Sequence, residues 1–337
     1  MLKLRRSIGR AIALVTALTI LVAAPVIGSA PARPVAALAS GRAAATLEGG
    51  ADGPFAVGKI VMHFIDTRRH VHFRGRPPEP RPVETVIWYP ATTDLSGGEP
   101  LPAARPATAS GPFPLVVFGH GYDSTPAVYT SLLRAWARAG YVVAAPIFPR
   151  TNAHAPGGPD EFDIVNQPAD MSFVITRILA ASAADDGLLA GLVDPHEVAV
   201  AGHSDGAATA LATAYDSRYL DRRVDAAVIL SGAEALRGHY FRGSGPPLLA
   251  SEGTADRVNL PKYTYQYFRA AHAPKYLLTM IGAPHLRPYI KQPQLGVVER
   301  VTVAFLDLYL KGLPAAVSRL RTAGTDEPRL ATLSADP

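Results

Sequence analysis

From residue 57 onward, the apolar positions of this chain form short runs that alternate with helical stretches. The first two runs, Val57–Ile65 and Val83–Tyr89, predict strands separated by the polar, Pro-rich stretch Arg74–Pro82. The run Phe113–Gly119 is continuously apolar, as expected for a parallel strand that is covered on both faces. Five later runs predict further strands: Tyr141–Ala145, Val198–Ala201, Ala226–Leu230, Pro247–Ala250 and Tyr276–Ile281.

Helical patterns lie between these runs, over Thr130–Ala139, Pro168–Ala183, Asp205–Ala214, Tyr263–Ala271 and Gly296–Lys311. Strands and helices that alternate in this way predict one α/β domain with a mostly parallel, doubly wound sheet flanked by helices. We expect this domain to span residues 57–312, followed by a C-terminal tail, 313–337.

A long irregular segment, Pro146–Gln167, follows one of the central predicted strands. Ligands of open α/β sheets bind at the carboxyl ends of the strands. The segment is either a solvated surface loop or a frame around a substrate cleft.

The first residues have the order of a secretory signal peptide. Residues 1–10 are basic, and an apolar run of 14 residues, Ala11–Ala24, follows before Pro25. A bilayer-spanning helix needs roughly 20 residues, so a cleaved signal fits better than a membrane anchor. We therefore expect export out of the cytoplasm, to the cell envelope or the medium.

The signal peptide is expected to cover residues 1–32, with cleavage after Ala32 and with Ala39 as the second candidate site. Arg5 and Arg6 leave both the general and the twin-Arg export routes open. Residues 33–56 are rich in Ala, Gly and Pro, which is typical of a flexible lead-in.

The charge balance argues against a nucleic-acid partner. The formal net charge is +5, but Lys3, Arg5, Arg6 and Arg10 contribute four of these charges, so the remaining chain carries only +1. The composition, with 48% apolar and 18% charged residues, is that of a folded globular protein, which we expect to be a monomer.

The chain contains no Cys, which excludes disulfides, thiolate metal sites and a Cys nucleophile. His70 and His72 lack a nearby third ligand, so we interpret them as solvated and expect no metal. The G-x-G-x-x-G pattern of nucleotide-binding folds is missing, and we expect no cofactor.

The strongest chemical signal is the pentapeptide Gly202–Gly206, G-H-S-D-G, placed between a predicted strand and an Ala-rich helix. In a nucleophile elbow, a sharp strand-to-helix turn exposes a Ser hydroxyl over the sheet edge, and flanking Gly residues keep the crowded space free of side chains. This pattern predicts Ser204 as a nucleophile.

A Ser nucleophile requires a base and a carboxylate that orients the base, in the chain order Ser, acid, His for this architecture. Asp256 lies in a loop just beyond the predicted strand Pro247–Ala250, and Glu252 is its rival. His285 lies beyond the next strand, whereas the alternative, His272, is at a helix end. We predict a triad of Ser204, Asp256 and His285.

Acyl transfer also requires backbone donors for the developing oxyanion. The run Gly119–Tyr122, G-H-G-Y, follows a predicted strand and can supply the N–H of Tyr122. Asp205, at the start of the next helix after the elbow, can supply the second N–H.

With these residues in view, the chain resembles the α/β-hydrolase superfamily over about residues 57–312. Within it, the chain is similar to the branch of dienelactone-hydrolase-like proteins, platelet-activating-factor acetylhydrolases, chlorophyllases and cutinase-type polyesterases. The segments that carry the resemblance are W-Y-P at Trp88–Pro90, H-G-Y at His120–Tyr122, P-A-D-M-S at Pro168–Ser172, G-H-S-D-G, G-T-A-D at Gly253–Asp256 and G-A-P-H at Gly282–His285. The resemblance implies a carboxylic-ester substrate and the same triad.

The chain departs from this branch in three ways. Dienelactone hydrolases use a Cys nucleophile, which this chain lacks. Asp205 replaces the apolar residue that commonly follows the nucleophile, and the disulfide common in cutinase-type polyesterases is missing. The sequence therefore favours a secreted serine esterase acting on small or lipid-like esters through an acyl-enzyme. The alternatives are an extracellular acyltransferase, a polyester hydrolase and a non-catalytic binding protein on the same scaffold.

Overall fold

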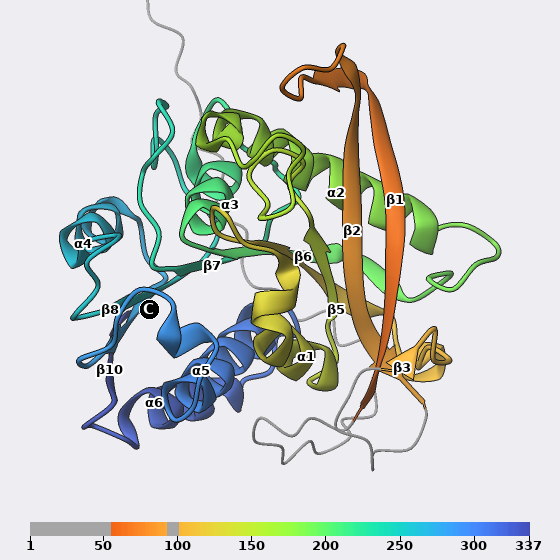
Figure 1. The fold of residues 1–337 in the computed structure, drawn as a ribbon. Helices are drawn as coiled ribbons and strands as arrows, with labels where there is room; N and C mark the ends of the chain where they lie inside the picture. The colour runs from red at the N-terminus through yellow and green to blue at the C-terminus, as the bar shows by residue number, and fades with distance from the viewer. Residues whose placement is uncertain (1–54, 93–100) are drawn as a thin grey trace, which may run out of the picture. The chain divides into compact units, whose positions relative to one another are not determined.

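The computed structural model describes residues 55–92 and 101–337 (Figure 1). The expected signal peptide, 1–32, and nearly all of the lead-in, 33–56, lie outside the described residues. In the described part of the chain, no helix combines the length and the apolar character needed to cross a bilayer.

A ten-stranded sheet forms the centre of the fold, in the order β10-β9-β8-β7-β6-β4-β5-β2-β1-β3. Its six central strands are parallel: β4 (Phe113–Gly119), β5 (Val142–Pro146), β6 (Val193–His203), β7 (Ala226–Leu230), β8 (Leu248–Gly253) and β9 (Lys275–Met280). Antiparallel pairing adds β1 (Ala56–Val71) and β2 (Glu79–Ala91) at one side and β10 (Ala331–Asp336) at the other, while the two-residue β3 (Leu101–Pro102) pairs parallel with β1. The predicted mostly parallel α/β sheet is confirmed.

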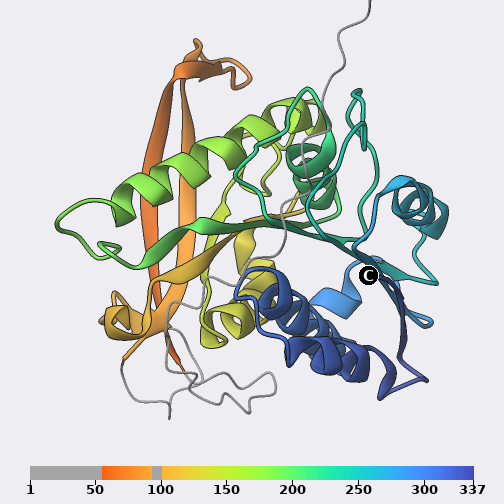
Figure 2. The same ribbon diagram turned by 180° about the vertical axis from the view of Figure 1, so that it is seen from behind.

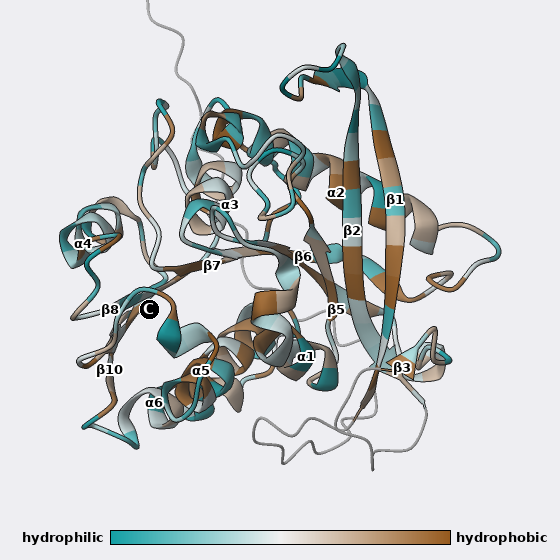
Figure 3. Cartoon of the chain, in the orientation of Figure 1, coloured by the Kyte–Doolittle hydropathy of each residue, from teal (hydrophilic) through white to brown (hydrophobic). Residues whose placement is uncertain are grey.

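Helices cover both faces of the sheet, as Figures 1 and 2 show. One face carries α1 (Thr130–Arg138), α5 (Gln294–Tyr309) and α6 (Ala316–Thr325), and the other carries α2 (Gln167–Ser182), α3 (Asp205–Tyr215) and α4 (Pro261–Ala270). Each face has its own apolar core, so the sheet is doubly wound. β4, β5 and β7 are apolar along their length, because both of their faces are covered, whereas β6 is polar and partly exposed before Val198 (Figure 3).

The first two predicted strands are longer in the structure, and the sheet domain continues beyond residue 312. β1 and β2 form a long hairpin that continues beyond Ile65, where residues 66–70 of β1 are all polar and therefore give no apolar run in the sequence. The expected C-terminal tail, 313–337, contains α6 and β10, and β10 pairs with β9 from Ala331 to Asp336. These residues therefore belong to the sheet domain, because backbone pairing closes an edge that β9 would otherwise expose.

A buried ion-pair network attaches the irregular segment after β5 to the sheet. The guanidinium of Arg81, on β2, is 1% exposed and bonds Asp170 of α2 (Nε to Oδ1 2.7 Å) and Asp163 (Nη2 to Oδ2 2.6 Å). Asp163 lies in the short 3₁₀ helix η3 (Glu161–Asn166) within the segment. Since an unpaired buried charge is costly, this network holds the segment in one position.

The elbow requires close backbone contact between β4, β6 and α3. A Cβ on Gly206 would lie 2.0 Å from the carbonyl oxygen of Gly119, and a Cβ on Gly202 would lie 2.2 Å from that of Gly206. Both contacts are with backbone, which cannot rotate away. Gly202 and Gly206 therefore have no room for a side chain larger than a hydrogen atom.

The substitution Gly206→Ala is expected to lower the free energy of unfolding by about 3 kcal/mol or more, because the added methyl group overlaps backbone in a packed core. Denaturant unfolding measures this change. Gly243→Ala is the matched control, since its Cβ would meet nothing within 4 Å. Equal unfolding midpoints for the two variants would contradict this packing.

Candidate active site

Ser204 stands at the turn between β6 and α3, in a strained backbone conformation. Its φ and ψ are 56° and −122°, outside the regions that residues with a side chain normally adopt. The N–H of Ser204 donates to the carbonyl of Leu230 on β7 (3.1 Å), and its own carbonyl accepts from Ala208 (2.9 Å). The turn is thus fixed from both sides, as a nucleophile elbow requires.

Hydrogen bonds join the loop after β8, which carries Asp256, to the loop after β9, which carries His285. The N–H of Ala255 donates to the carbonyl of Ala283 (3.1 Å), and the N–H of Gly282 donates to Oγ1 of Thr254 (2.8 Å). A Cβ on Gly253 would lie 2.3 Å from the oxygen of Ala283, so Gly permits this approach. The G-T-A-D and G-A-P-H segments therefore form one unit at the carboxyl ends of β8 and β9.

Within this unit, Asp256 and His285 form a hydrogen bond of 2.6 Å between Oδ2 and Nδ1. The other carboxylate oxygen of Asp256 accepts from the N–H of Val258 (2.8 Å). Burial alone would raise the pKa of Asp256, but these hydrogen bonds and the nearby imidazole hold it below its usual value. Asp256 is thus an anion that orients the imidazole.

The alternatives from the sequence lie elsewhere. Glu252 is buried at the end of β8 and bonds Gly253, Ser231 and Thr264. His272 lies at the C-terminal end of α4, where its Nε2 contacts the carbonyl of Phe241 at 3.3 Å. The structure places Asp256, and neither of these residues, on the imidazole of His285.

Nε2 of His285 is buried and makes no hydrogen bond to any described residue. Since Nδ1 faces the carboxylate of Asp256, Nε2 is the ring nitrogen that is free to accept a proton.

The backbone after β4 lies beside Ser204. A Cβ on Gly121 would be 3.2 Å from Cβ of Ser204, so the chain passes next to the elbow just before Tyr122. Among the described residues, neither the N–H of Tyr122 nor that of Asp205 has a hydrogen-bond acceptor. Two free N–H groups next to a nucleophile are the donors that an oxyanion requires.

Two buried histidines support the site, and the sequence analysis assigned no role to either. His203 donates from Nε2 to the carbonyl of His285 (3.0 Å), and its Nδ1 bonds the hydroxyl of Tyr129 (2.8 Å). His120 bonds the carbonyl of Gly121 (Nδ1, 2.8 Å) and the N–H of Phe148 (Nε2, 3.1 Å). In the sequence, their positions within the G-H-S-D-G and H-G-Y motifs are what could have indicated these supporting roles.

Both supporting histidines are neutral at physiological pH. Burial lowers the pKa of His203 to about 3, reinforced by the charge of His285, and burial lowers the pKa of His120 to about 4. They act as fixed hydrogen-bonding groups, one on the base loop and one on the oxyanion loop.

The carboxyl group of Asp205, the residue after Ser204, is partly buried at the start of α3. Burial, together with the charge of Glu161, raises the pKa of Asp205 to about 6, although His285 opposes this effect. Oδ2 is buried and has no partner among the described residues. The start of α3 favours the ionised form, since a helix N-terminus carries partial positive charge.

The segment after β5 lies against the oxyanion loop. The hydroxyl of Tyr122 donates to the carbonyl of Pro159 (3.2 Å), and the N–H of Asp123 donates to the carbonyl of Thr151 (2.9 Å). The segment 146–167 is therefore placed beside the site, where it can frame a bound substrate.

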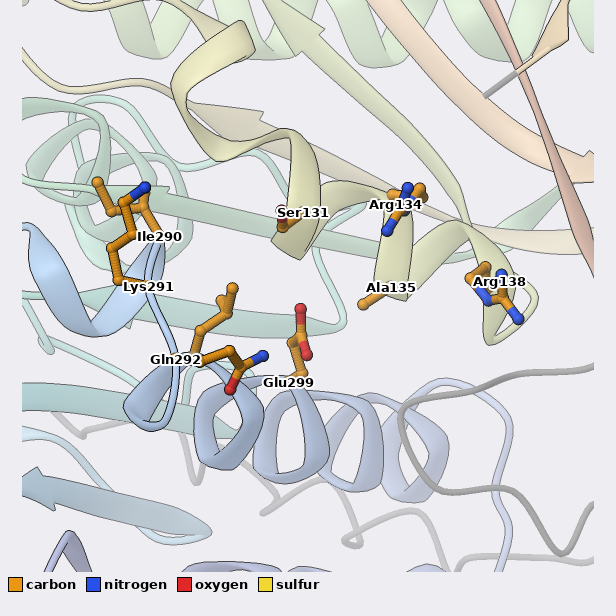
Figure 4. A pocket seen from close by; sticks show the side chains of 9 residues that line it. Ser131, Arg134, Ala135, Arg138, Ile290, Lys291, Gln292 and Glu299 are labelled. Carbon is orange, nitrogen blue, oxygen red and sulfur yellow. The ribbon is translucent and has the colours of Figure 1, made fainter. Parts of the chain in front are cut away.

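The cavities among the described residues include the following two. One, of about 550 Å³, lies between α1 and the start of α5, and no triad residue lines it (Figure 4). The other, of about 320 Å³, lies beside the carboxyl ends of β7 and β8 and is lined by Ala233, Glu234, Ala235, Asn259, Tyr263 and Gln266. The second cavity is the one that neighbours the loop of Asp256.

Residues 81–251 match the model of the chlorophyllase family. This match covers β2 to β8, including the oxyanion loop and the elbow. The chain belongs to the chlorophyllase family. Members of this family are α/β hydrolases that act on carboxylic esters, and this protein is accordingly a carboxylic ester hydrolase.

Among solved structures, the chain is similar to a ferulic acid esterase from Streptomyces cinnamoneus. The two sequences are 22% identical, and the alignment covers 86% of this chain and 99% of the other, with a TM-score of 0.63. This likeness shows that the two proteins share the fold. None of the curated proteins compared with the chain matches it.

Proposed function

We propose that the protein is a secreted serine esterase, which hydrolyses carboxylic esters through an acyl-enzyme. The observation that carries this proposal is the joined arrangement of Asp256 and His285 beside an elbow that exposes Ser204. Two free N–H groups on Tyr122 and Asp205 complete the groups that acyl transfer requires.

In the first half of the reaction, Oγ of Ser204 attacks the ester carbonyl carbon while Nε2 of His285 accepts the hydroxyl proton. Asp256 stabilises the imidazolium that forms. The carbonyl oxygen becomes an oxyanion held by the N–H groups of Tyr122 and Asp205. The imidazolium then protonates the leaving alcohol, and the acyl group remains on Ser204.

In the second half, a water molecule takes the place of the alcohol. Nε2 of His285 accepts a proton from this water, whose oxygen attacks the acyl carbon. The tetrahedral intermediate collapses when the imidazolium returns the proton to Oγ of Ser204. The products are the carboxylic acid and the free enzyme.

The cavity of about 320 Å³ supports a small or lipid-like ester as substrate. Its lining residues 233–235 follow Gly232, which packs against Ala207 near the start of the elbow helix. One half of the ester can occupy this cavity, while the loop at Tyr122 and Pro159 faces the other half.

The first 25 residues support export, because a basic segment is followed by an apolar run and then by Pro25, as in a secretory signal peptide.

Ester hydrolysis is expected to be lost in acid, because Nε2 of His285 must be unprotonated to accept the proton of Ser204. His120 and His203, with pKa values of about 4 and 3, stay neutral above pH 5 and do not contribute to this loss. The measurement is kcat/KM for a short-chain p-nitrophenyl ester against pH, on purified mature protein.

An Asp205→Asn variant removes a carboxyl group whose pKa is raised to about 6, so any change in kcat/KM that comes from this group is absent from its pH profile. The loss of hydrolysis in acid should remain in this variant. No ester hydrolysis at any pH would overturn the proposed mechanism.

A further inference from the structure

The mechanism leaves one buried hydroxyl group beside the elbow unused. Tyr129 is the last residue of the 3₁₀ helix η2 (Pro126–Tyr129), which leads into α1, and it is only 1% exposed. Its hydroxyl oxygen lies 2.8 Å from Nδ1 of His203 on β6 and 3.3 Å from the backbone nitrogen of Gly121. Buried polar networks whose members are all satisfied make the elements that they join rigid.

The tautomer of His203 fixes the direction of the first of these bonds. The carbonyl oxygen of His285 can only accept a hydrogen bond, so Nε2 of His203, 3.0 Å away, carries the ring hydrogen. His203 is also neutral at physiological pH, because burial lowers its pKa to about 3. Its Nδ1 therefore holds a lone pair and no hydrogen. The hydroxyl of Tyr129 must donate to this nitrogen.

The oxygen of Tyr129 then serves as an acceptor for the oxyanion loop, the loop after β4 that carries Tyr122. Because its only hydrogen points at His203, its lone pairs are left for the N–H of Gly121. Burial raises the pKa of Tyr129 to about 12, so the hydroxyl keeps this hydrogen at neutral pH. A chain of hydrogen bonds thus runs from Gly121 through the two rings to the carbonyl of His285.

We infer that Tyr129 is a positioning residue of the esterase site: its hydroxyl group holds the oxyanion loop and the base loop, the loop after β9 that carries His285, at a fixed distance through His203. This inference rests on the proposed function. At one end of the chain of bonds, Gly121 precedes Tyr122, whose N–H is one of the proposed oxyanion donors. At the other end lies the residue that accepts the proton. Tyr129 itself is buried and acts only through these neighbours.

Close packing keeps these hydrogen bonds in place. The ring of His203 lies 5.5 Å from that of Tyr129 and 4.6 Å from that of His285, measured between ring centroids. A Cβ on Gly121 would lie 3.3 Å from the hydroxyl oxygen of Tyr129 and 3.4 Å from Nδ1 of His203, so the loop is already in close contact with both groups. Tyr289 also packs on His203, but its hydroxyl bonds serines after β7 and in β8 and leaves Nδ1 to Tyr129.

The substitution Tyr129→Phe removes a single oxygen atom and keeps the ring. The N–H of Gly121 and Nδ1 of His203 then lose their shared partner, and both loops shift toward other partners. Since the oxyanion and the imidazolium form only as the ester reacts, we expect kcat to fall by about 10- to 100-fold and KM to change by less than about threefold. The readout is steady-state hydrolysis of a short-chain p-nitrophenyl ester by the purified mature protein.

Tyr215→Phe is the matched control for this substitution. Tyr215 is a buried tyrosine of α3, and its hydroxyl donates to the carbonyl of Pro246 (3.0 Å) at the amino end of β8, whereas the elbow lies at the carboxyl end of β6. The control also removes one oxygen atom from a buried ring, and it should leave kcat and KM unchanged. Wild-type kcat in a folded Tyr129→Phe variant, or an equal loss in both variants, would overturn the inference.

His203→Leu, alone and combined with Tyr129→Phe, tests whether the two residues act through one another. Leucine fills a similar volume but has no nitrogen, so the link to the carbonyl of His285 is lost in both the single and the double variant. If the bonds form one chain, the double variant should lose little more kcat than the more impaired single variant. Losses that multiply would show that Tyr129 and His203 act independently, and would overturn the inference.

The tautomer of His203 provides a readout that does not depend on activity. Nitrogen-15 NMR of protein labelled at histidine distinguishes a ring nitrogen that carries hydrogen from one that accepts a hydrogen bond, and the His203→Leu variant assigns the signals. We predict a neutral ring with its hydrogen on Nε2 from pH 5 to 8. The Nδ1 signal should shift in the Tyr129→Phe variant and stay unchanged in the Tyr215→Phe control.

A hydrogen on Nδ1 of His203, or an Nδ1 signal that is the same in wild type and in the Tyr129→Phe variant, would overturn the inference. Folded wild-type protein that hydrolyses no ester would instead refute the proposed function. The NMR measurement would then still show whether Tyr129 donates to His203.

Discussion

Replacing Ser204 with alanine is expected to lower kcat/KM for ester hydrolysis by at least about a thousandfold, because no other group can form the acyl-enzyme. The residual rate comes from the N–H groups of Tyr122 and Asp205, which the substitution leaves in place. Steady-state kinetics on the purified mature variant measure this loss.

The same variant should fold normally. Alanine keeps the Cβ of Ser204, so the strain at φ 56° is unchanged, and we expect the free energy of unfolding to shift by about 0.5 kcal/mol or less. Ser217→Ala, at an exposed serine, is the matched control and should retain wild-type kinetics. Substantial ester hydrolysis by the Ser204 variant would refute the nucleophile assignment.

The substitution Asp256→Asn is expected to reduce kcat by about a thousandfold or more. An amide cannot stabilise the imidazolium of His285, and its NH₂ group can donate to Nδ1 and so place the ring proton on Nε2. Nε2 would then be unable to accept the proton of Ser204. The loss should therefore appear mainly in kcat, with a smaller effect on KM.

Glu252→Gln is the comparison that identifies the triad acid. If Asp256 is the acid, the Asn variant at 256 loses activity and the Gln variant at 252 keeps it. The opposite pattern would show that Glu252 orients the base, contrary to the 2.6 Å contact between Asp256 and His285.

The sequence predicted the central sheet because the parallel strands are covered on both faces and therefore read as short apolar runs. The position of Ser204, Asp256 and His285 at one edge of the sheet was also predictable. Each of them follows a strand whose carboxyl end meets that edge. Local pattern and topology were sufficient for these features.

The remaining features depend on contacts between distant segments. The segment 313–337 contains α6 and the partly exposed strand β10, whose pairing with β9 is made by backbone atoms and leaves no apolar run in the sequence. The contact of His203 with the carbonyl of His285 likewise joins segments that lie far apart along the chain. Nothing in S-E-G-T-A-D alone shows which carboxyl group faces the imidazole.

Treatment of the folded mature protein with a fluorophosphonate, followed by peptide mapping, tests the central claim most directly. An activated serine loses its hydroxyl proton to the base and its oxygen bonds to phosphorus as the P–F bond breaks and fluoride leaves, whereas ordinary serines do not react. We predict a single adduct, on Ser204, which disappears in the Ser204→Ala variant. Folded protein that takes up no label, or takes it up at another residue, would contradict the assignment of a serine-esterase site at this elbow.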